Sequence, residues 1–139
     1  MRVLVSGAES SGTHFVMDLL AAGGADVTHR SQPNGDSWID LKAMMEGGFD
    51  HCVVVVRGFH AHCSSQVRRN IEPHFGMAVI RRQKALRYIA PILGDERTIL
   101  VTYESLAALI EREVLLDILR LDVTAASKVE WHDENEKYS

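Results

Sequence analysis

Hydrophobic positions along the chain alternate between two kinds of spacing. Short, almost unbroken apolar runs are typical of strands that are buried on both faces of a sheet. The predicted strands are residues 2–6, 25–29, 52–56 and 98–103. Between them, apolar residues recur at the spacing of one helical face. The predicted helices are residues 12–20, 38–45, 60–70, 77–93 and 105–121. Strands that alternate with helices predict an α/β fold, a doubly wound parallel sheet of about four strands with helices on both faces.

Three of these helices carry specific predictions about their ends and their packing. Asp36 or Ser37 is the expected N-cap of the helix at 38–45, because either side chain can accept a hydrogen bond from the first helical N–H groups. Pro91 is expected to end the helix at 77–93 early, since proline cannot continue a helix. In the last helix, the residues expected to face the core are Leu106, Leu109, Ile110, Val114 and Ile118.

Composition places the chain among ordinary globular proteins. Of its 139 residues, 46% are hydrophobic and 24% are charged. There is no apolar run of about 18 residues that could span a membrane, and the chain begins without the pattern of a signal peptide. We therefore expect a cytoplasmic protein without a membrane partner, with one domain at 1–125 and an acidic, at most partly ordered tail at 126–139. Cys52 and Cys63 are expected to be reduced and structural.

The charges are unevenly distributed although the net charge is only −4. The segment 57–87 holds a single acid, Glu72, against a group of basic residues. These residues are Arg57, Arg68, Arg69, Arg81, Arg82, Lys84 and Arg87. A basic middle in an acidic chain predicts a local anion site rather than nucleic-acid binding. The alternative is a pair of helices whose basic faces are solvated.

Residues 7–13, G-A-E-S-S-G-T, have the G-x-x-x-x-G spacing of a phosphate-binding loop (P-loop) and lie directly between a predicted strand and a predicted helix. Glycines allow a tight turn, so that backbone N–H groups and the helix N-terminus point at a phosphate. The predicted phosphate contacts are Gly7, Ser10, Ser11, Gly12 and Thr13. P-loop nucleoside triphosphatases have a lysine directly after the second glycine, and this chain has Thr13 there, which disfavours ATP or GTP hydrolysis. An ordinary strand-to-helix turn is the alternative.

Three segments resemble the sulfotransferases that use 3′-phosphoadenosine 5′-phosphosulfate (PAPS). Residues 11–13, S-G-T, are similar to the core of the family's 5′-phosphosulfate loop. The strand at 53–56 is followed by Arg57 and, eight residues later, by Ser65, which resembles the family's 3′-phosphate motif. Residues 101–106, V-T-Y-E-S-L, are similar to the segment that closes the family's fourth core strand. The resemblance covers the core of the predicted fold.

This resemblance implies that PAPS is the sulfuryl donor, that a hydroxyl or amine is the acceptor, and that no metal takes part. It implies that Arg57 and Ser65 bind the 3′-phosphate of the nucleotide. The chain departs from the family at Ser10, where many members have a basic residue, at the neighbouring Glu9, and in lacking a C-terminal R-K-G segment. The alternatives are a non-catalytic nucleotide-binding P-loop domain and a small nucleotide kinase-like phosphotransferase. The latter is disfavoured because the lysine is missing and no aspartate for Mg²⁺ is evident.

His29 and His60 are the candidate catalytic bases for the acceptor, since histidine titrates near neutral pH. His29 comes at the end of the second predicted strand, in the same sheet as the loop strand. His60 and His62 follow the third predicted strand and are expected near the same edge of the sheet. A surface or capping role is the alternative for each histidine. Trp38 and Trp131 can stack on an aromatic acceptor or on adenine, or can pack internally.

Overall fold

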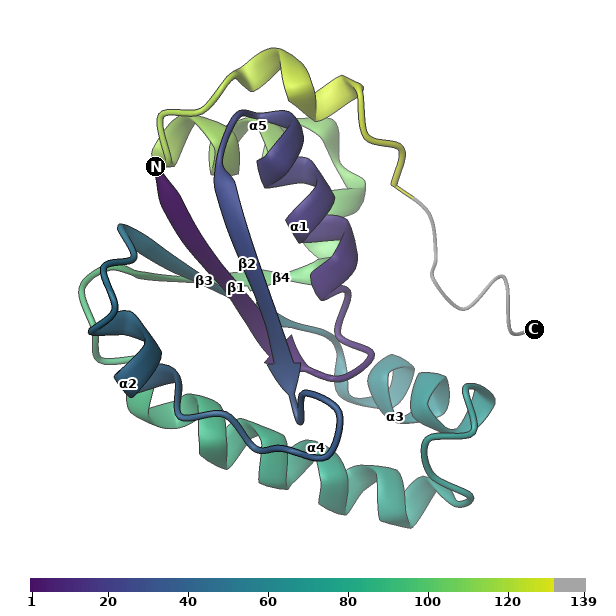
Figure 1. Cartoon of the computed structure of the whole chain (residues 1–139). Helices are drawn as coiled ribbons and strands as arrows, with labels where there is room; N and C mark the ends of the chain where they lie inside the picture. Colours follow the sequence, from purple (N-terminus) through teal and green to yellow (C-terminus); the bar gives the residue numbers. More distant parts are fainter. Residues whose placement is uncertain (132–139) are drawn as a thin grey trace.

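The computed structural model describes residues 1–131 of the 139-residue chain (Figure 1). Its strands are β1 (Arg2–Ala8), β2 (Asp26–Gln32), β3 (His51–Val56) and β4 (Thr98–Thr102). Its α-helices are α1 (Thr13–Ala22), α2 (Leu41–Met45), α3 (Phe59–Arg68), α4 (Phe75–Ile89) and α5 (Leu109–Ile118). Short 3₁₀ helices are η1 (Ala90–Ile92), η2 (Tyr103–Ala107) and η3 (Val123–Ser127).

The four strands form one all-parallel sheet in the order β2-β1-β3-β4, which confirms the predicted α/β fold (Figure 1). The chain leaves β1 through α1 toward β2, and it leaves β3 through α3 and α4 toward β4. Strand order therefore reverses between β1 and β3. In sheets of this kind, ligands bind outside the carboxyl ends of the strands at that reversal.

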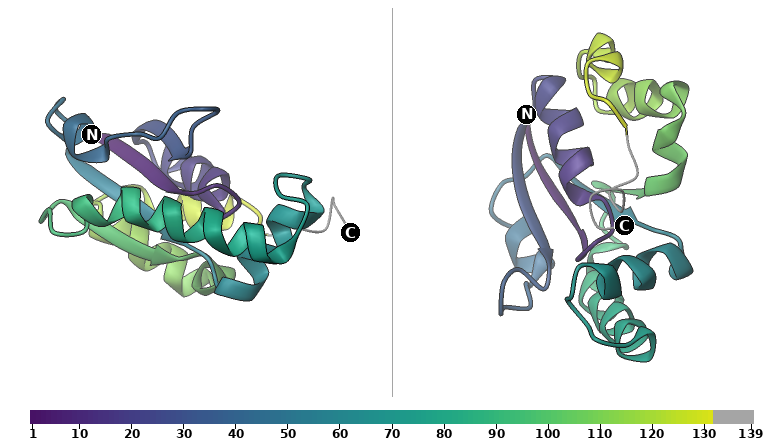
Figure 2. Two further views of the ribbon diagram at one scale, coloured as in Figure 1. Left: turned by 90° about the horizontal axis from the view of Figure 1, so that it is seen from below. Right: turned by 90° about the vertical axis from the view of Figure 1, so that its right-hand side faces the viewer.

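Helices cover both faces of the sheet, because successive strand residues point to opposite sides. Val3, Val5 and Val53 face α1 and α5 in one buried cluster. Leu4 and Val54 face the other side, where the buried cluster is completed by α2, η1 and the end of α4. The two layers are visible on either side of the sheet in Figure 1 and Figure 2.

Two predicted boundaries between strand 2 and helix 2 are wrong. β2 extends three residues beyond His29, since residues 30–32 continue to pair with the end of β1 although their side chains are polar. α2 begins at Leu41, and its N-cap is Asp40, whose side chain accepts a hydrogen bond from the Ala43 N–H. Asp36 and Ser37 are not caps because they lie in a turn closed by two backbone hydrogen bonds between residues 34 and 37.

The prediction for the last helix is wrong in its extent and in most of its packing. η2 and α5 are separated at Ala108, whose extended backbone (φ −82°, ψ 128°) resets the helical phase. Leu106 is buried as predicted. Four residues expected to face the core are instead exposed, namely Leu109 (43%), Ile110 (62%), Val114 (45%) and Ile118 (57%). The buried residues of this region are Leu115, Leu116 and Leu119.

Other predicted features are found in place. α4 ends at Ile89 and Pro91 lies in the following 3₁₀ turn, as expected. Cys52 and Cys63 are free and buried. Part of the predicted tail packs on the core, since the Trp131 ring lies 5.6 Å from the Tyr103 ring, whereas residues 132–139 lie outside the described residues. No helix in the described part of the chain is long and apolar enough to cross a membrane.

Candidate functional site

The loop between β1 and α1 is built around the two glycines of the sequence motif. Gly12 has a left-handed backbone (φ 93°), and a Cβ there would overlap the ring of Tyr103. A Cβ on Gly7 would lie 2.6 Å from both the Val55 carbonyl oxygen and the Ser11 hydroxyl oxygen. Both positions therefore require glycine because neighbouring atoms approach the backbone closely.

Helix α3 holds the loop through a row of polar side chains. The His62 Nε2–H donates to the carbonyl oxygen of Glu9 at 2.6 Å, and the Gln66 side-chain amide donates to the same oxygen at 3.2 Å. One turn further, Arg69 donates to the Ser10 hydroxyl oxygen at 2.9 Å. These residues recur at i, i+4 and i+7, which places them on one helical face. The Glu9 peptide carbonyl is thus turned toward α3.

Arg57, the residue directly after β3, reaches the same loop. Its side chain is only 3% exposed, and one of its guanidinium nitrogens donates to the Ser10 carbonyl oxygen at 3.2 Å. The guanidinium also lies over the Tyr103 ring, 5.4 Å from the ring centroid. Arg82 donates to the Arg57 carbonyl oxygen at 3.0 Å. Arg57 therefore helps to shape the loop that follows β1.

The acidic side chain of the loop is paired. The Glu9 carboxylate lies 2.9 Å from the guanidinium of Arg81 on α4, and the same guanidinium lies 3.4 Å from the Glu72 carboxylate. An anion approaching the loop therefore meets a Glu9 charge that is already compensated. This ion pair reduces the repulsion that the sequence places beside the S-G-T segment.

His62 is neutral and its tautomer is defined by its two partners. Its Nε2–H donates to a carbonyl oxygen, while its Nδ1 accepts a hydrogen bond from Arg82 at 3.1 Å. Burial, assisted by the nearby charges of Arg82 and Arg57, lowers the pKa of His62 to about 4. A proton on Nδ1 would face Arg82 and break that hydrogen bond.

His29 lies in the middle of β2, opposite Val5, and not at a strand end as predicted. Its Nε2 lies 2.7 Å from the Thr13 hydroxyl oxygen, so it contacts the first residue of α1. The rings of His29 and His14 are 4.5 Å apart. Burial, and then the charges of His14 and Arg30, lower the pKa of His29 to about 4.

The remaining predicted site residues divide into two groups. Ser10, Ser11 and Thr13 are buried in the loop, and Ser65 is buried on α3, three residues from His62 and therefore on the loop-facing side. His60 is exposed at the start of α3, where its ring lies 5.4 Å from the Phe75 ring. The structure thus gathers the predicted phosphate contacts around one loop but leaves His60 outside this group.

Several residues that hold the loop were not predicted as site residues. They are Gln66, Arg69 and Arg81, which contact the loop directly, and Arg82, which contacts His62 and Arg57 behind it. Of the basic residues at 57–87, for which the sequence predicts an anion site, Arg57 and Arg69 donate hydrogen bonds to Ser10, and Arg81 pairs with the Glu9 carboxylate. The spacing of His62, Gln66 and Arg69 is the signal in the sequence that points to this face of α3.

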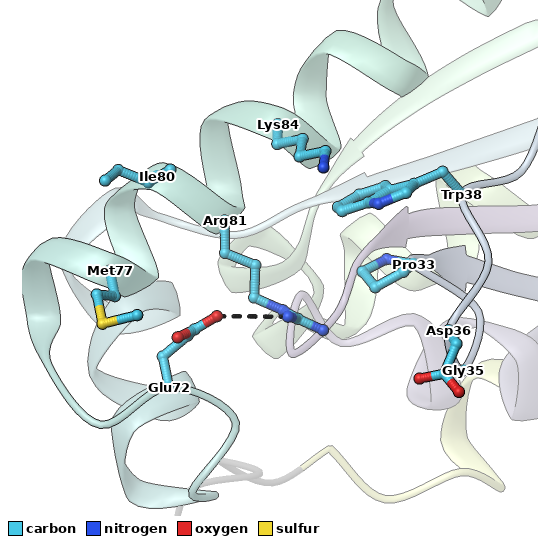
Figure 3. Close-up of a pocket in the computed structure, with 9 residues that line it drawn as sticks. All are labelled: Pro33, Gly35, Asp36, Trp38, Glu72, Met77, Ile80, Arg81 and Lys84. Atoms are coloured by element: carbon cyan, nitrogen blue, oxygen red, sulfur yellow. Dashed lines mark hydrogen bonds and ion pairs between the residues drawn. The ribbon is translucent and has the colours of Figure 1, made fainter.

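A cleft adjoins the loop at the carboxyl end of β2. It lies between the turn at residues 33–38 and helix α4, and Arg81 lines it (Figure 3). Because Arg81 pairs with Glu9, the cleft and the loop share one side chain. In the part of the chain that the structure describes, no group of three or more His, Cys, Asp or Glu side chains could hold a metal ion.

Comparison of the chain with protein-family models, with curated proteins and with solved structures finds no match. The structure itself defines the class of the fold, which is an α/β protein with a doubly wound, all-parallel, Rossmann-like sheet. The loop after β1 and Arg57 after β3 lie at the reversal of strand order. That is the position at which such sheets bind ligands.

Proposed function

We propose that the loop at residues 7–13 binds a phosphate of a nucleotide, and that the protein transfers a sulfuryl group from PAPS to a hydroxyl or amine. The observation that carries this proposal is the anchoring of the loop. Side chains hold the carbonyl oxygens of Glu9 and Ser10, and Arg81 pairs with the one acid. Behind the loop, the first N–H groups of α1 have no intrahelical partner and carry partial positive charge. Such a helix start favours a bound anion.

The choice of PAPS over a nucleoside triphosphate rests on the residues around Thr13. No lysine occupies this position, and the Thr13 hydroxyl contacts His29. A triphosphate would lack the cation that normally neutralises its outer phosphates. The resemblance of the three sequence segments to PAPS-dependent enzymes supports the same choice. We assign Arg57 and Ser65 to the 3′-phosphate of the donor.

In the proposed reaction, the acceptor oxygen or nitrogen forms a bond to sulfur as the bond from sulfur to the bridging oxygen of PAPS breaks. The products are the sulfated acceptor and adenosine 3′,5′-bisphosphate. His29 is the base that takes the acceptor's proton, since its ring lies beside the first helical residue after the loop. With a pKa of about 4, His29 is neutral at pH 7 but is a weak base. Its expected contribution is therefore near the lower end of about 10²–10⁴-fold.

Nucleotide binding without turnover is the second candidate function. The contact between the His29 Nε2 and the Thr13 hydroxyl favours it, because it engages the ring nitrogen that would have to take the acceptor's proton.

Thermal unfolding with added nucleotides, followed by a turnover assay, tests both candidates. At roughly 100 times its Kd, adenosine 3′,5′-bisphosphate should stabilise the protein by about 2.7 kcal/mol relative to the ligand-free protein. The same concentration of AMP should stabilise it less. Labelled PAPS with a panel of hydroxyl and amine acceptors should then yield labelled product. Stabilisation without product supports binding alone. Equal shifts for AMP and the bisphosphate, or a larger shift with Mg-ATP, contradict the assignment of the donor.

A further inference from the structure

The cleft beside the loop has the size of a small-molecule site. Its volume is about 410 Å³, within the range of ligand pockets in proteins. The turn after β2 supplies Pro33 and Trp38, and α4 supplies Met77, Ile80 and Lys84 (Figure 3). Met77 and Ile80 are 47% and 66% exposed, so their apolar side chains are available to an occupant of the cleft.

Trp38 forms an aromatic platform at one end of this cleft. Its indole stacks on the ring of Tyr88, with the centroids 4.8 Å apart and the planes within 12° of parallel. Tyr88 does not line the cleft, so it supports the indole from outside. A platform held in this way is suited to stacking with a planar ring, which prefers an offset parallel arrangement.

The charge beside the platform is positive. The Lys84 ammonium lies over the Trp38 ring, 4.9 Å from its centroid, and no carboxylate of the described residues pairs with it. Arg81, the other cation of the cleft, is held between Glu9 and Glu72. In Figure 3 the carboxylates of Glu72 and Asp36 lie at the opposite end of the cleft from Lys84.

We propose that this cleft binds a planar aromatic molecule that carries an anionic group such as a carboxylate, sulfonate or phosphate. The ring stacks on Trp38 and packs against the apolar side chains of α4, and the anionic group pairs with Lys84. The Arg81 ion pairs engage Glu9 and Glu72, so these two carboxylates repel this group less. Asp36 lies at the opposite end of the cleft from Lys84 (Figure 3). This is a second site, and its occupation does not depend on nucleotide binding by the loop.

The test uses the indole N–H signals of the full-length protein in ¹H–¹⁵N spectra. The chain has two tryptophans, and Trp131→Phe assigns the signal of Trp38. The probes are naphthoate, the neutral naphthylmethanol and the cationic naphthylmethylammonium. We expect naphthoate to shift the Trp38 signal with the highest affinity of the three. Naphthylmethanol should bind about two- to fivefold more weakly, as expected for loss of one exposed charge pair.

Lys84→Gln should reduce the affinity for naphthoate to that for naphthylmethanol and leave naphthylmethanol binding unchanged. Lys128→Gln, which removes the same charge from an exposed position outside the cleft, is the matched control and should change neither affinity. Three results would each overturn the proposal. They are an unmoved Trp38 signal up to about 10 mM naphthoate, equal or tighter binding of naphthylmethylammonium, and equal effects of the two lysine substitutions.

Discussion

Gly12 needs glycine for two reasons, its left-handed backbone and the close approach of a neighbouring ring. Gly24 has only the first reason, so comparing the two positions separates the two effects. Both have left-handed backbones (φ 93° and 102°), but a Cβ at Gly12 meets the Tyr103 ring whereas one at Gly24 meets nothing within 4 Å. Gly24→Ala should therefore cost only the backbone term, about 1–2 kcal/mol. Gly12→Ala should cost about 1–3 kcal/mol more because it overpacks a buried ring. Urea unfolding measures both, and equal costs would contradict the close approach at Gly12.

His29 and His60 differ in position, and this difference predicts how their removal affects turnover. His29 contacts Thr13, whereas His60 lies against Phe75 at the exposed start of α3. Under the proposed function, His29→Ala should lower kcat by about 10²-fold, as for loss of a general base. His60→Ala should leave kcat unchanged and serves as the control. Sulfuryl transfer that survives His29→Ala at the parental rate would show that His29 is not the base.

At the scale of elements, the break at Ala108 decides which side of α5 faces the core. Two substitutions in this helix test this. Leu116 is fully buried, and Ile110 is 62% exposed. Leu116→Ala should destabilise the protein by about 2–5 kcal/mol because it leaves a cavity. Ile110→Ala should cost no more than about 0.5 kcal/mol, as for a surface substitution. Chemical unfolding measures the loss of stability in both variants. A large loss for Ile110→Ala would mean that Ile110 faces the core, as the sequence predicts.

The sequence predicts buried elements better than exposed ones, for a physical reason. β1 contains the apolar run at residues 3–5 and β3 the run at 52–56, so the positions of these strands follow from burial on both faces, although β1 continues two residues beyond its predicted end. The end of β2 is polar and pairs through its backbone, which side chains do not encode. The apolar stripe of α5 at 110, 114 and 118 has helical spacing, but spacing alone does not say which stripe faces the sheet.

In the candidate site, too, some residues could be predicted from the sequence and others could not. The glycine loop and Arg57 could be predicted, because strand ends in such sheets are where ligands bind. For the other side chains that hold the loop, the spacing of His62, Gln66 and Arg69 indicates a shared helical face, but the loop atoms that they bind are brought close only by the fold. His29 was predicted at a strand end and lies within the strand, yet the contact with Thr13 still places it beside the loop.

At the scale of the whole molecule, buried neutral histidines predict how stability depends on pH. The pKa of His62 is about 4 in the folded protein, against an ordinary value of 6.5. Below pH 6.5 the unfolded chain therefore binds a proton that the folded protein does not, so stability falls as the pH drops toward 4. His62 alone should account for about 3 kcal/mol over this range. The low pKa of His29 acts in the same direction.

Urea unfolding at several pH values measures this loss. His62→Gln should lower stability at pH 7 but make the fall between pH 6.5 and 4 clearly shallower, because the titrating group is gone. His60→Gln, at an exposed position, should leave the slope unchanged. A slope that is the same in all three proteins would contradict the neutral, buried state of His62.

The central claim is that the loop at residues 7–13 binds the phosphate of a nucleotide, and backbone amide signals test it most directly. In ¹H–¹⁵N spectra, adenosine 3′,5′-bisphosphate should shift the amide signals of Gly12 and Thr13 most, because these N–H groups lie at the start of α1. AMP should shift the same signals with lower affinity, and adenosine should leave them in place. Signals that stay unmoved with the bisphosphate, or that move equally with adenosine, would contradict phosphate binding by this loop.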